Sequence, residues 1–428
     1  MSRRILIALA AALSSAAPLA AQPASAQQSA PSETSAELLT KAREARLKGD
    51  VPNWLHYGTR ALALMPGHPD ILISVARANA AAGEKAEALA LLAQAVRRGA
   101  GVDPVRFAEF KPLAGDPELE ALAADGRRNL TPVARAATFA ELPERGSEGI
   151  AYDPASRRFF VGTDRGELLA VGMDGKVTQF ASGGGLRQVL GIKVDAGRRL
   201  LWLANGRYPE AGPDQPADAG TGGVRAYNLD TGALVAEAEL DERPALIHGF
   251  NDIALAGDGT VYVTDSNTSA VYRLAPGGKQ LELLLRDDAM SFPNGIVPAA
   301  DGRTLYVAHA EGISALDPAT PSRRLLPVPA NGSVHSIDGL LLHEGVLYGV
   351  QNSPYMHRVV GAALAPDGRS INRVWTVNAR DPAEYLQTTA AIAGTHLYMI
   401  GGRPMPDVYG GTNPAQPTRK IWRVLLRE

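Results

Sequence analysis

The sequence of 428 residues contains no cysteine. This absence excludes disulfide bonds, thiol catalysis and cysteine-based metal sites, so any metal must be held by oxygen or histidine. Charge of one sign is also missing, because 43 lysine and arginine residues face 45 aspartate and glutamate residues, a formal net charge of -2. With no basic stripe either, the sequence predicts no nucleic-acid partner. The Gly-x-Ser-x-Gly motif is absent too, which leaves a serine hydrolase of that class without support.

A long hydrophobic run occurs near the N-terminus, where "ILIALAAALSSAAPLA" follows the positively charged "MSRR" and precedes the small-x-small sequence "ASA" at residues 24–26. This order is typical of a signal peptide, so we expect cleavage after residue 26 and a periplasmic or secreted protein. The run is too short and too alanine-rich for a spanning helix, and we expect no membrane span after cleavage. An uncleaved membrane anchor is the alternative, and the general secretory route is favoured over twin-arginine export.

The remaining composition is that of a globular protein, with 45% hydrophobic and 21% charged residues. The length is enough for two or three domains. The 44 glycines and 30 prolines cluster in the last two thirds of the chain, where they favour short strands joined by tight turns.

Residues 35–128 have helical periodicity. Apolar residues recur at three- and four-residue spacing in "SAELLTKAREARLKGD", in "NWLHYGTRALALMPGHP" and in "DILISVARANAAAGEKAEALALLAQAVRRGAG". Gly49, Gly67 and Pro69 mark the helix ends. The pattern returns after about 34 residues, which resembles tetratricopeptide repeats. We therefore predict a small all-α domain of helical repeats over 35–128.

From residue 134 to the C-terminus the period changes to two. Six units consist of a strand, a tight turn and a second strand: "SEGIAYDPASRRFFVGT", "VLGIKVDAGRRLLWLAN", "FNDIALAGDGTVYVTD", "PNGIVPAADGRTLYVAH", "IDGLLLHEGVLYGVQ" and "TTAAIAGTHLYMIGG". Their spacing of roughly 40 to 60 residues is that of propeller blades. The sequence predicts a six-bladed β-propeller over 134–428, with residues 137–142 completing the last blade beside "KIWRVLLR" so that no sheet edge stays open.

One position in these units carries oxygen-bearing side chains. It precedes the Gly/Asp-Ile or Gly-Leu pair and is occupied by Glu148, Leu190, Asn251, Asn294, Asp338 and Thr388 or Thr389. The first strand of each blade is innermost, so these positions should meet at one level of the central channel. Two carboxylates and two carboxamides suit a hard cation such as calcium. The alternatives are side chains that cap their own turns, or a wet polar channel without metal.

Long loops follow the second strands of blades two, five and six, on the face where the oxygen-bearing residues lie. Binding sites usually lie on such loops. Their side chains Tyr208, Tyr355, Arg403 and Tyr409 can wall a pocket, although each alone is equally explained as ordinary surface.

The motifs "SEGIAYD", "FNDIALAGDGTVYVTDS", "FPNGIVPAADGRTLYVAH" and "SIDGLLLHEGVLYGV" resemble the gluconolactonase/regucalcin (senescence marker protein) family. More distantly, they resemble strictosidine synthase-like and paraoxonase propellers. The resemblance implies that Glu148, Asn294 and Asp338 bind one divalent cation and that Asp338 takes a proton from water. It implies that Asn251 contacts substrate or calcium. The gluconolactonase branch has a substrate-binding arginine where this chain has Gly249, which places a sugar-acid lactone in doubt.

Together these features predict a calcium-dependent hydrolase of a lactone or related ester. Asp338, His248 and His335 are the expected proton acceptors, since each histidine stands three residues before an expected ligand. Asn251, Tyr355 and Arg403 are the expected substrate contacts. Leu190 and the threonine position leave one side of the ring open for water and substrate. The alternative is a non-catalytic binding protein with structural calcium, whose helical repeats dock a protein or peptide partner.

Overall fold

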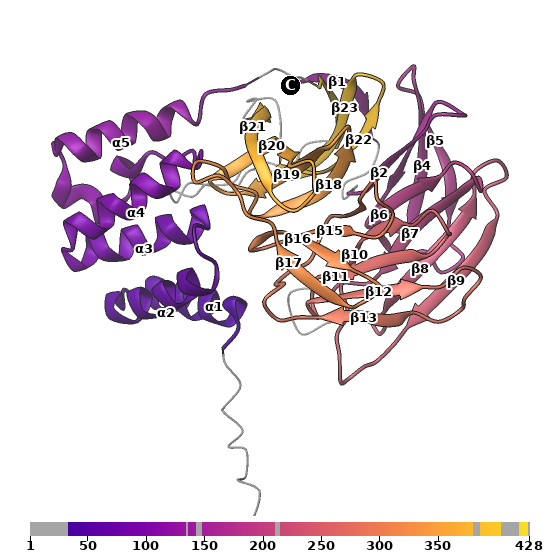
Figure 1. Cartoon of the computed structure of the whole chain (residues 1–428), viewed down its shortest axis with the longest axis horizontal. Helices are drawn as coiled ribbons and strands as arrows, with labels where there is room; N and C mark the ends of the chain where they lie inside the picture. Colours follow the sequence, from indigo (N-terminus) through magenta and orange to yellow (C-terminus); the bar gives the residue numbers. More distant parts are fainter. Residues whose placement is uncertain are drawn as a thin grey trace, which may run out of the picture. The chain divides into compact units, whose positions relative to one another are not determined.

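The computed structural model describes residues 33–133, 136–142, 148–209, 215–379, 386–403 and 419–426 (Figure 1). The expected signal peptide over 1–26 and Tyr409 lie outside these residues. Among the described helices, none combines the length and the hydrophobicity that crossing a membrane requires.

Helices occupy residues 33–133. They are α1 (Ser35–Leu47), α2 (Val51–Leu64), α3 (Pro69–Ala82), α4 (Lys85–Arg97) and α5 (Pro117–Arg128), with 3-10 turns at Pro104–Arg106 and Ala108–Leu113. The sequence sets their ends. Thr34 and Glu37 form a capping box at the start of α1, and Gly83 ends α3 with a left-handed φ of 85°. An all-α segment before the propeller is confirmed, whereas its resemblance to tetratricopeptide repeats stays a prediction.

The rest of the chain forms six four-stranded antiparallel sheets, and this confirms the six-bladed propeller. Blade one contains β2 (Ile150–Asp153), β3 (Arg158–Gly162), β4 (Glu167–Gly172) and β5 (Val177–Ser182), and blade two contains β6 (Gln188–Asp195), β7 (Leu200–Gly206), β8 (Gly222–Asn228) and β9 (Leu234–Leu240). Blade three contains β10 (Phe250–Leu255), β11 (Val261–Asp265), β12 (Ala270–Leu274) and β13 (Glu282–Arg286), and blade four contains β14 (Ile296–Pro298), β15 (Leu305–His309), β16 (Gly312–Asp317) and β17 (Ser322–Leu325). Blade five contains β18 (Ile337–His343), β19 (Val346–Ser353), β20 (Met356–Leu364) and β21 (Ile371–Ala379), and blade six contains β22 (Leu386–Ala393), β23 (His396–Arg403), β24 (Lys420–Leu425) and β1 (Ala137–Glu141).

The ring of blades is closed by the strand that comes first in the sequence. β1 pairs antiparallel with β24, with Thr138 opposite Trp422 and Glu141 opposite Lys420. The predicted closure is therefore confirmed. No open edge is left at this point, where an unpaired strand would invite association with another chain.

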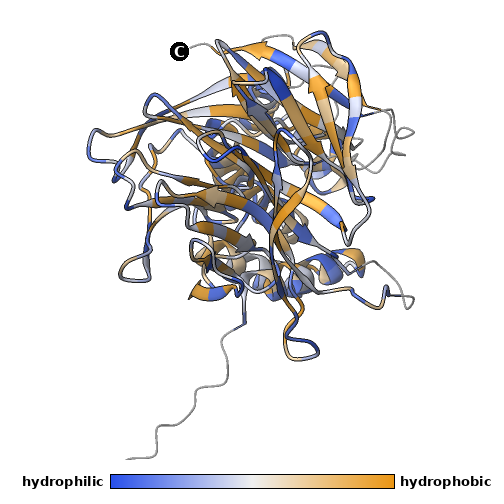
Figure 2. Ribbon diagram, turned by 90° about the vertical axis from the view of Figure 1, so that its right-hand side faces the viewer, coloured by the Kyte–Doolittle hydropathy of each residue, from blue (hydrophilic) through white to orange (hydrophobic). Residues whose placement is uncertain are grey.

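Hydrophobic contacts between neighbouring blades form the core. Successive side chains of a strand point to opposite faces, so Phe159 and Phe160 reach different neighbours. Phe159 packs against Tyr398 of blade six at 4.4 Å between ring centroids, while Phe160 belongs to a cluster with Leu201 of blade two. Figure 2 shows hydrophobic residues along the strands and hydrophilic residues in many connecting turns.

The innermost strands approach each other at backbone contact. A Cβ added to Gly149 would lie 1.8 Å from the Leu190 carbonyl oxygen, and one added to Gly295 would lie 2.5 Å from that of Asp338. Gly191 and Gly339 meet the next blade in the same way. Glycine after the oxygen-bearing position thus has a packing reason: it brings the starts of the innermost strands together around the axis.

The helical segment contacts blades four and five where the innermost strands begin. Ser35 and Ser291 share a hydroxyl hydrogen bond of 2.6 Å, Ser353 donates to Asp70 at 3.1 Å, and the Gly101 amide donates to the Tyr355 carbonyl at 2.8 Å. Tyr355 and Met356 belong to the same hydrophobic cluster as the helices. These helices therefore complete their core with side chains of the propeller.

Candidate functional site at the start of the innermost strands

The predicted positions are neighbours in one ring. The Thr389 hydroxyl donates to the Glu148 carbonyl at 2.6 Å, which joins blades six and one. The Thr264 hydroxyl donates to the Asn294 carbonyl at 2.8 Å, and the Gly295 amide donates to the Asp338 carbonyl at 2.8 Å. Together with the glycine contacts, these bonds place Glu148, Leu190, Asn251, Asn294, Asp338 and Thr389 around one axis.

Both carboxamides are placed so that an oxygen is left for a ligand. Asn251 donates from Nδ2 to the Ser266 hydroxyl at 3.0 Å, and that hydroxyl donates to the Pro293 carbonyl at 2.8 Å. Since the nitrogen of Asn251 is held in this way, its Oδ1 remains for a ligand. Asn294 Oδ1 is buried without a hydrogen-bond partner. A buried acceptor left unpaired is costly, so a cation or a donor is expected at this atom.

Asp338 supplies a carboxylate to the same ring. It is 8% exposed, and its Oδ2 accepts a hydrogen bond from Asn352 Nδ2 at the end of β19. That bond orients the carboxylate within the ring.

The pKa of Tyr208 is sensitive to the negative charge around the ring. Burial is the main cause that raises the pKa of its phenol, and the negative charges of Glu148, Asp265 and Asp338 raise it further. Glu148 and Asp338 belong to different blades, yet both raise the pKa of the same phenol. The phenol stays protonated and donates to the Gly249 carbonyl at 2.7 Å.

The same tyrosine packs over Gly249, the glycine two residues before Asn251. A Cβ on Gly249 would lie 2.8 Å from Cε1 of Tyr208, so the ring packs directly over this backbone. Asn267 Cγ would lie 2.7 Å from the same Cβ, so a side chain at position 249 has no room between Tyr208 and Asn267.

His248 is fully buried and faces away from solvent. Its Nδ1 lies 2.6 Å from Asp265 Oδ2, its Nε2 lies 3.2 Å from Glu242, and its ring stacks on Phe250 at 5.2 Å. Burial raises the pKa of Asp265, but hydrogen bonds from His248, Thr268 and the Gly249 amide lower it below its ordinary value overall. This arrangement holds the loop before β10 and does not suit a base that must meet water.

His335 lies where the helical segment meets blade five. Its Nδ1 is 3.0 Å from the Ser333 hydroxyl, and its ring is 5.1 Å from that of His68, whose Nε2 is 3.0 Å from the Ser336 hydroxyl. Burial lowers the pKa of His68 to about 4 and the pKa of His335 well below its ordinary value. Both imidazoles are therefore neutral near pH 7.

The expected substrate contacts other than Asn251 are placed differently. Tyr355 is 8% exposed and packs against Phe107 of the helical segment at 6.4 Å between ring centroids, so it anchors the helices where a pocket wall was expected. Arg403 ends β23, and its side chain lies outside the described residues.

Below the ring, a lysine that the sequence analysis did not single out enters the channel. Lys193 Nζ lies 2.7 Å from Asp252 Oδ1, and Asp252 Oδ2 also accepts the Ile296 amide at 3.2 Å. Lys193 lines both a narrow cavity beside the ring glycines and a cavity of about 300 Å³ bordered by all six innermost strands. Asp252 is therefore already paired, although it follows Asn251 directly.

A second row of side chains supports the ring and was also missed. Asp164, Ser266 and Asn352 hold equivalent positions in blades one, three and five. In each of these blades a residue of the second strand pairs with the isoleucine or leucine near the start of the innermost strand, and the side chain in question comes three residues after it. Ser266 and Asn352 bond to Asn251 and Asp338, while Asp164 Oδ1 is buried without a hydrogen-bond partner. The sequence contained a signal for this row, because each of its members directly follows the last residue of one of the six aligned strand–turn–strand units. Within the described residues, no group of three or more His, Asp or Glu side chains could hold a metal ion.

Blade four buries two titratable groups on the ring face. His309 is 1% exposed, and burial lowers its pKa to about 3. Glu311 lies 4.0 Å from Arg323 with a side chain 13% exposed, and burial raises its pKa from 4.5 to about 7.

We expect Glu311→Gln to stabilise the protein at high pH only. The folded protein keeps the Glu311 proton to about pH 7, whereas the unfolded chain loses it near 4.5, so this group costs stability as the pH rises between those values. The gain in unfolding free energy over the wild type should grow from near zero at pH 4 to about 3 kcal/mol at most at pH 8. Urea unfolding at several pH values measures it. Glu44→Gln, at an exposed site, is the control, and an equal gain at pH 4 and pH 8 would contradict the burial of the charge.

No family model matches the chain, and no curated protein matches its sequence. Solved structures with a similar fold include a calcium-binding protein, regucalcin, from Agrobacterium tumefaciens (18% identity, TM-score 0.49, 68% of this chain and 93% of that chain). They also include a luciferin-regenerating enzyme (14% identity, TM-score 0.47, 69% of this chain and 95% of that chain). A third is the PQQ-bound aldose sugar dehydrogenase from Streptomyces coelicolor (16% identity, TM-score 0.46, 69% of this chain and 100% of that chain). Each likeness concerns the fold alone.

Proposed function

We propose that this protein is a divalent-cation-dependent hydrolase that opens a lactone or cleaves a related ester. Glu148, Asn251, Asn294 and Asp338 would hold the cation, and calcium fits their oxygens best. The observation that carries the proposal is the buried, unpartnered Oδ1 of Asn294, in a ring that also contains two carboxylates. The resemblance to the gluconolactonase/regucalcin family supports the same assignment.

The donor set fits calcium in kind and in number. Calcium takes six to eight oxygens, and the ring offers four side chains from four blades. Leu190 and Thr389 complete the ring without a charged donor, which leaves coordination positions for water and substrate. Asp164, with its buried and unpartnered Oδ1, is a further donor on the Glu148 side.

The chain's own residues would position and deprotonate the attacking water. When bound, the cation would polarise the substrate carbonyl as a Lewis acid. Asn352 orients the Asp338 carboxylate, which would accept the proton of the water. The water oxygen adds to the carbonyl carbon, the carbon–oxygen bond of the lactone breaks, and the leaving oxygen takes the proton. His335, neutral and three residues away, is the second base within this proposal.

Tyr208 argues for a substrate other than a sugar-acid lactone. A protonated phenol covers Gly249, and the negative charges of Glu148 and Asp338 act at the same place. Position 249 itself supplies no positive charge to bind an acidic group, so we expect a neutral lactone or aryl ester. We also propose that the protein is exported to the periplasm or outside the cell. The helical segment would bind a protein or peptide partner.

The experiment combines metal analysis of the purified protein with a panel of neutral lactones, sugar-acid lactones and aryl esters. We expect calcium to co-purify at about one ion per chain, and turnover that a chelator abolishes and calcium restores. Turnover that persists in the chelator would contradict the cation's role in the reaction.

The second candidate is a non-catalytic binding protein with structural calcium. The observation that favours it is the helical segment, which packs on blades four and five on the face where the innermost strands begin. The same experiment separates the two functions, because calcium bound without turnover of any panel member would support binding alone.

A further inference from the structure

A large groove separates blades four and five at the far ends of their strands. It has a volume of about 1320 Å³ and is bordered by the turns after β14, β16, β18 and β20. β14 and β18 begin at the ring of oxygen-bearing residues, so this groove opens on the opposite face of the propeller. It is distinct from the candidate metal centre.

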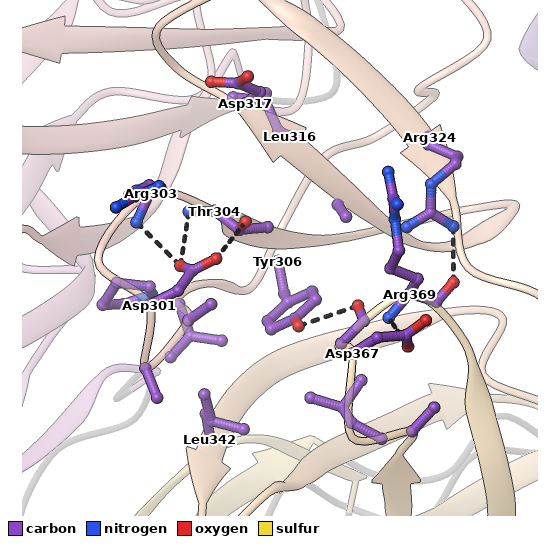
Figure 3. Close-up of a pocket in the computed structure, with 18 of the residues that line it drawn as sticks. Asp301, Arg303, Thr304, Tyr306, Leu316, Asp317, Arg324, Leu342, Asp367 and Arg369 are labelled. Atoms are coloured by element: carbon purple, nitrogen blue, oxygen red, sulfur yellow. Dashed lines mark hydrogen bonds between the residues drawn. The ribbon is translucent and has the colours of Figure 1, made fainter.

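The floor of the groove is apolar and built for a close contact between the blades. Tyr306 is 3% exposed and donates to the Gly368 carbonyl at 3.1 Å (Figure 3), and Leu342 and Leu364 pack against the same hydrophobic cluster. A Cβ on Gly368 would lie 2.5 Å from the Tyr306 hydroxyl, and its φ is 67°. Only glycine allows this turn to reach the tyrosine.

The acidic residues of the groove are mostly bound to their own turns. Asp301 accepts the amides of Arg303 and Thr304 at 2.8 and 2.9 Å, Asp317 accepts the Ala319 amide at 2.8 Å, and Asp367 accepts the Arg369 amide at 2.9 Å. The remaining acid, Glu344, is exposed at the edge.

Most of the arginines of the groove, in contrast, have no acidic partner among the described residues. Arg323 pairs with Asp287 at 2.7 Å, but among the described residues Arg303, Arg324 and Arg369 form no ion pair. Arg324 donates from Nη1 to the Arg369 carbonyl at 2.6 Å, which brings the two residues together at one end of the groove. Figure 3 shows Arg303 at the other end, with Tyr306 between. Two neighbouring guanidinium groups repel each other unless an anion lies between them, and a carboxylate matches their geometry.

We propose that this groove binds an elongated molecule with a carboxylate at each end and an apolar middle, that is, a linear dicarboxylate. One carboxylate contacts Arg324 and Arg369, the other contacts Arg303, and the chain between them covers Tyr306, Leu342 and Leu364. The proposal does not depend on the proposed hydrolase, since the groove shares no residue with the ring.

Calorimetry with linear dicarboxylates of six to twelve carbons tests it, with the monocarboxylate of equal length as the reference for the apolar contribution. We expect the best dicarboxylate to bind at least about tenfold more tightly than its monocarboxylate, because the second carboxylate gains charged hydrogen bonds. The affinity should be equal in calcium and in chelator. Arg324→Gln and Arg303→Gln should each reduce it about tenfold.

Arg423→Gln is the matched control, because Arg423 is exposed on β24 of blade six and its replacement changes the net charge equally. Circular dichroism and melting verify that each variant folds. Equal affinity for dicarboxylate and monocarboxylate would overturn the proposal, as would a loss of affinity in Arg423→Gln equal to that in Arg324→Gln.

Discussion

Calcium is expected to raise the melting temperature of the wild-type protein and to leave that of Asp338→Ala unchanged. The ligands come from four blades, so the folded ring binds the cation and the unfolded chain does not. At a hundredfold excess over the dissociation constant, binding adds about 2.7 kcal/mol to the unfolding free energy. Asp338→Ala removes a carboxylate that is only 8% exposed, and we expect the whole increment to be lost together with hydrolysis.

Two further variants make this result specific. Asn251→Ala removes a neutral donor, so it should retain part of the calcium increment. Asp317→Ala removes a carboxylate from a turn at the other end of blade four, where it bonds to the Ala319 amide. It should lower stability slightly and keep the full increment. Thermal melting of all four proteins in calcium and in chelator provides the measurement.

The opposite outcome is informative. If the wild type melts at one temperature in both conditions, the oxygen-bearing side chains cap turns or line a wet channel. The proposed metal centre would then be wrong, and the proposed hydrolase with it.

The second large effect is expected at Gly149. The alanine Cβ would lie 1.8 Å from the Leu190 carbonyl oxygen, a distance that no contact between these atoms allows. Since the obstacle is backbone, relief requires blades one and two to move apart. We expect Gly149→Ala to lower the unfolding free energy by about 3 kcal/mol, at the upper end for added core atoms. It should also weaken calcium binding, because Glu148 is the adjacent residue.

Gly257→Ala is the matched control for this substitution. No heavy atom lies within 4 Å of the added Cβ at position 257, and the backbone there is not left-handed. Urea unfolding of both variants compares an obstructed with an open site. Equal stability of the two would show that the innermost strands yield easily, and would contradict ring closure by backbone contact.

The sequence alone determined the blades and the register of the ring. Alternating apolar residues and turn motifs are local signals, and six copies of one signal indicate six similar units. The pairing of β1 with β24 follows, because a closed ring needs a strand from the beginning of the chain. Equivalent positions in similar blades lie at the same level of the central channel. The alignment of the units therefore predicts that Glu148, Asn251, Asn294 and Asp338 are neighbours.

Only the tertiary structure decided what each side chain does. The sequence showed His248 and His335 at equal distances before expected ligands, yet His248 is buried against Asp265 and His335 lies against His68 of a distant helix. Tyr355 was expected in a pocket and packs with Phe107 among the helices. These outcomes depend on partners brought close by the packing of helices and blades. Local periodicity specifies which face of a strand a residue occupies, but not which neighbour fills the space on that face.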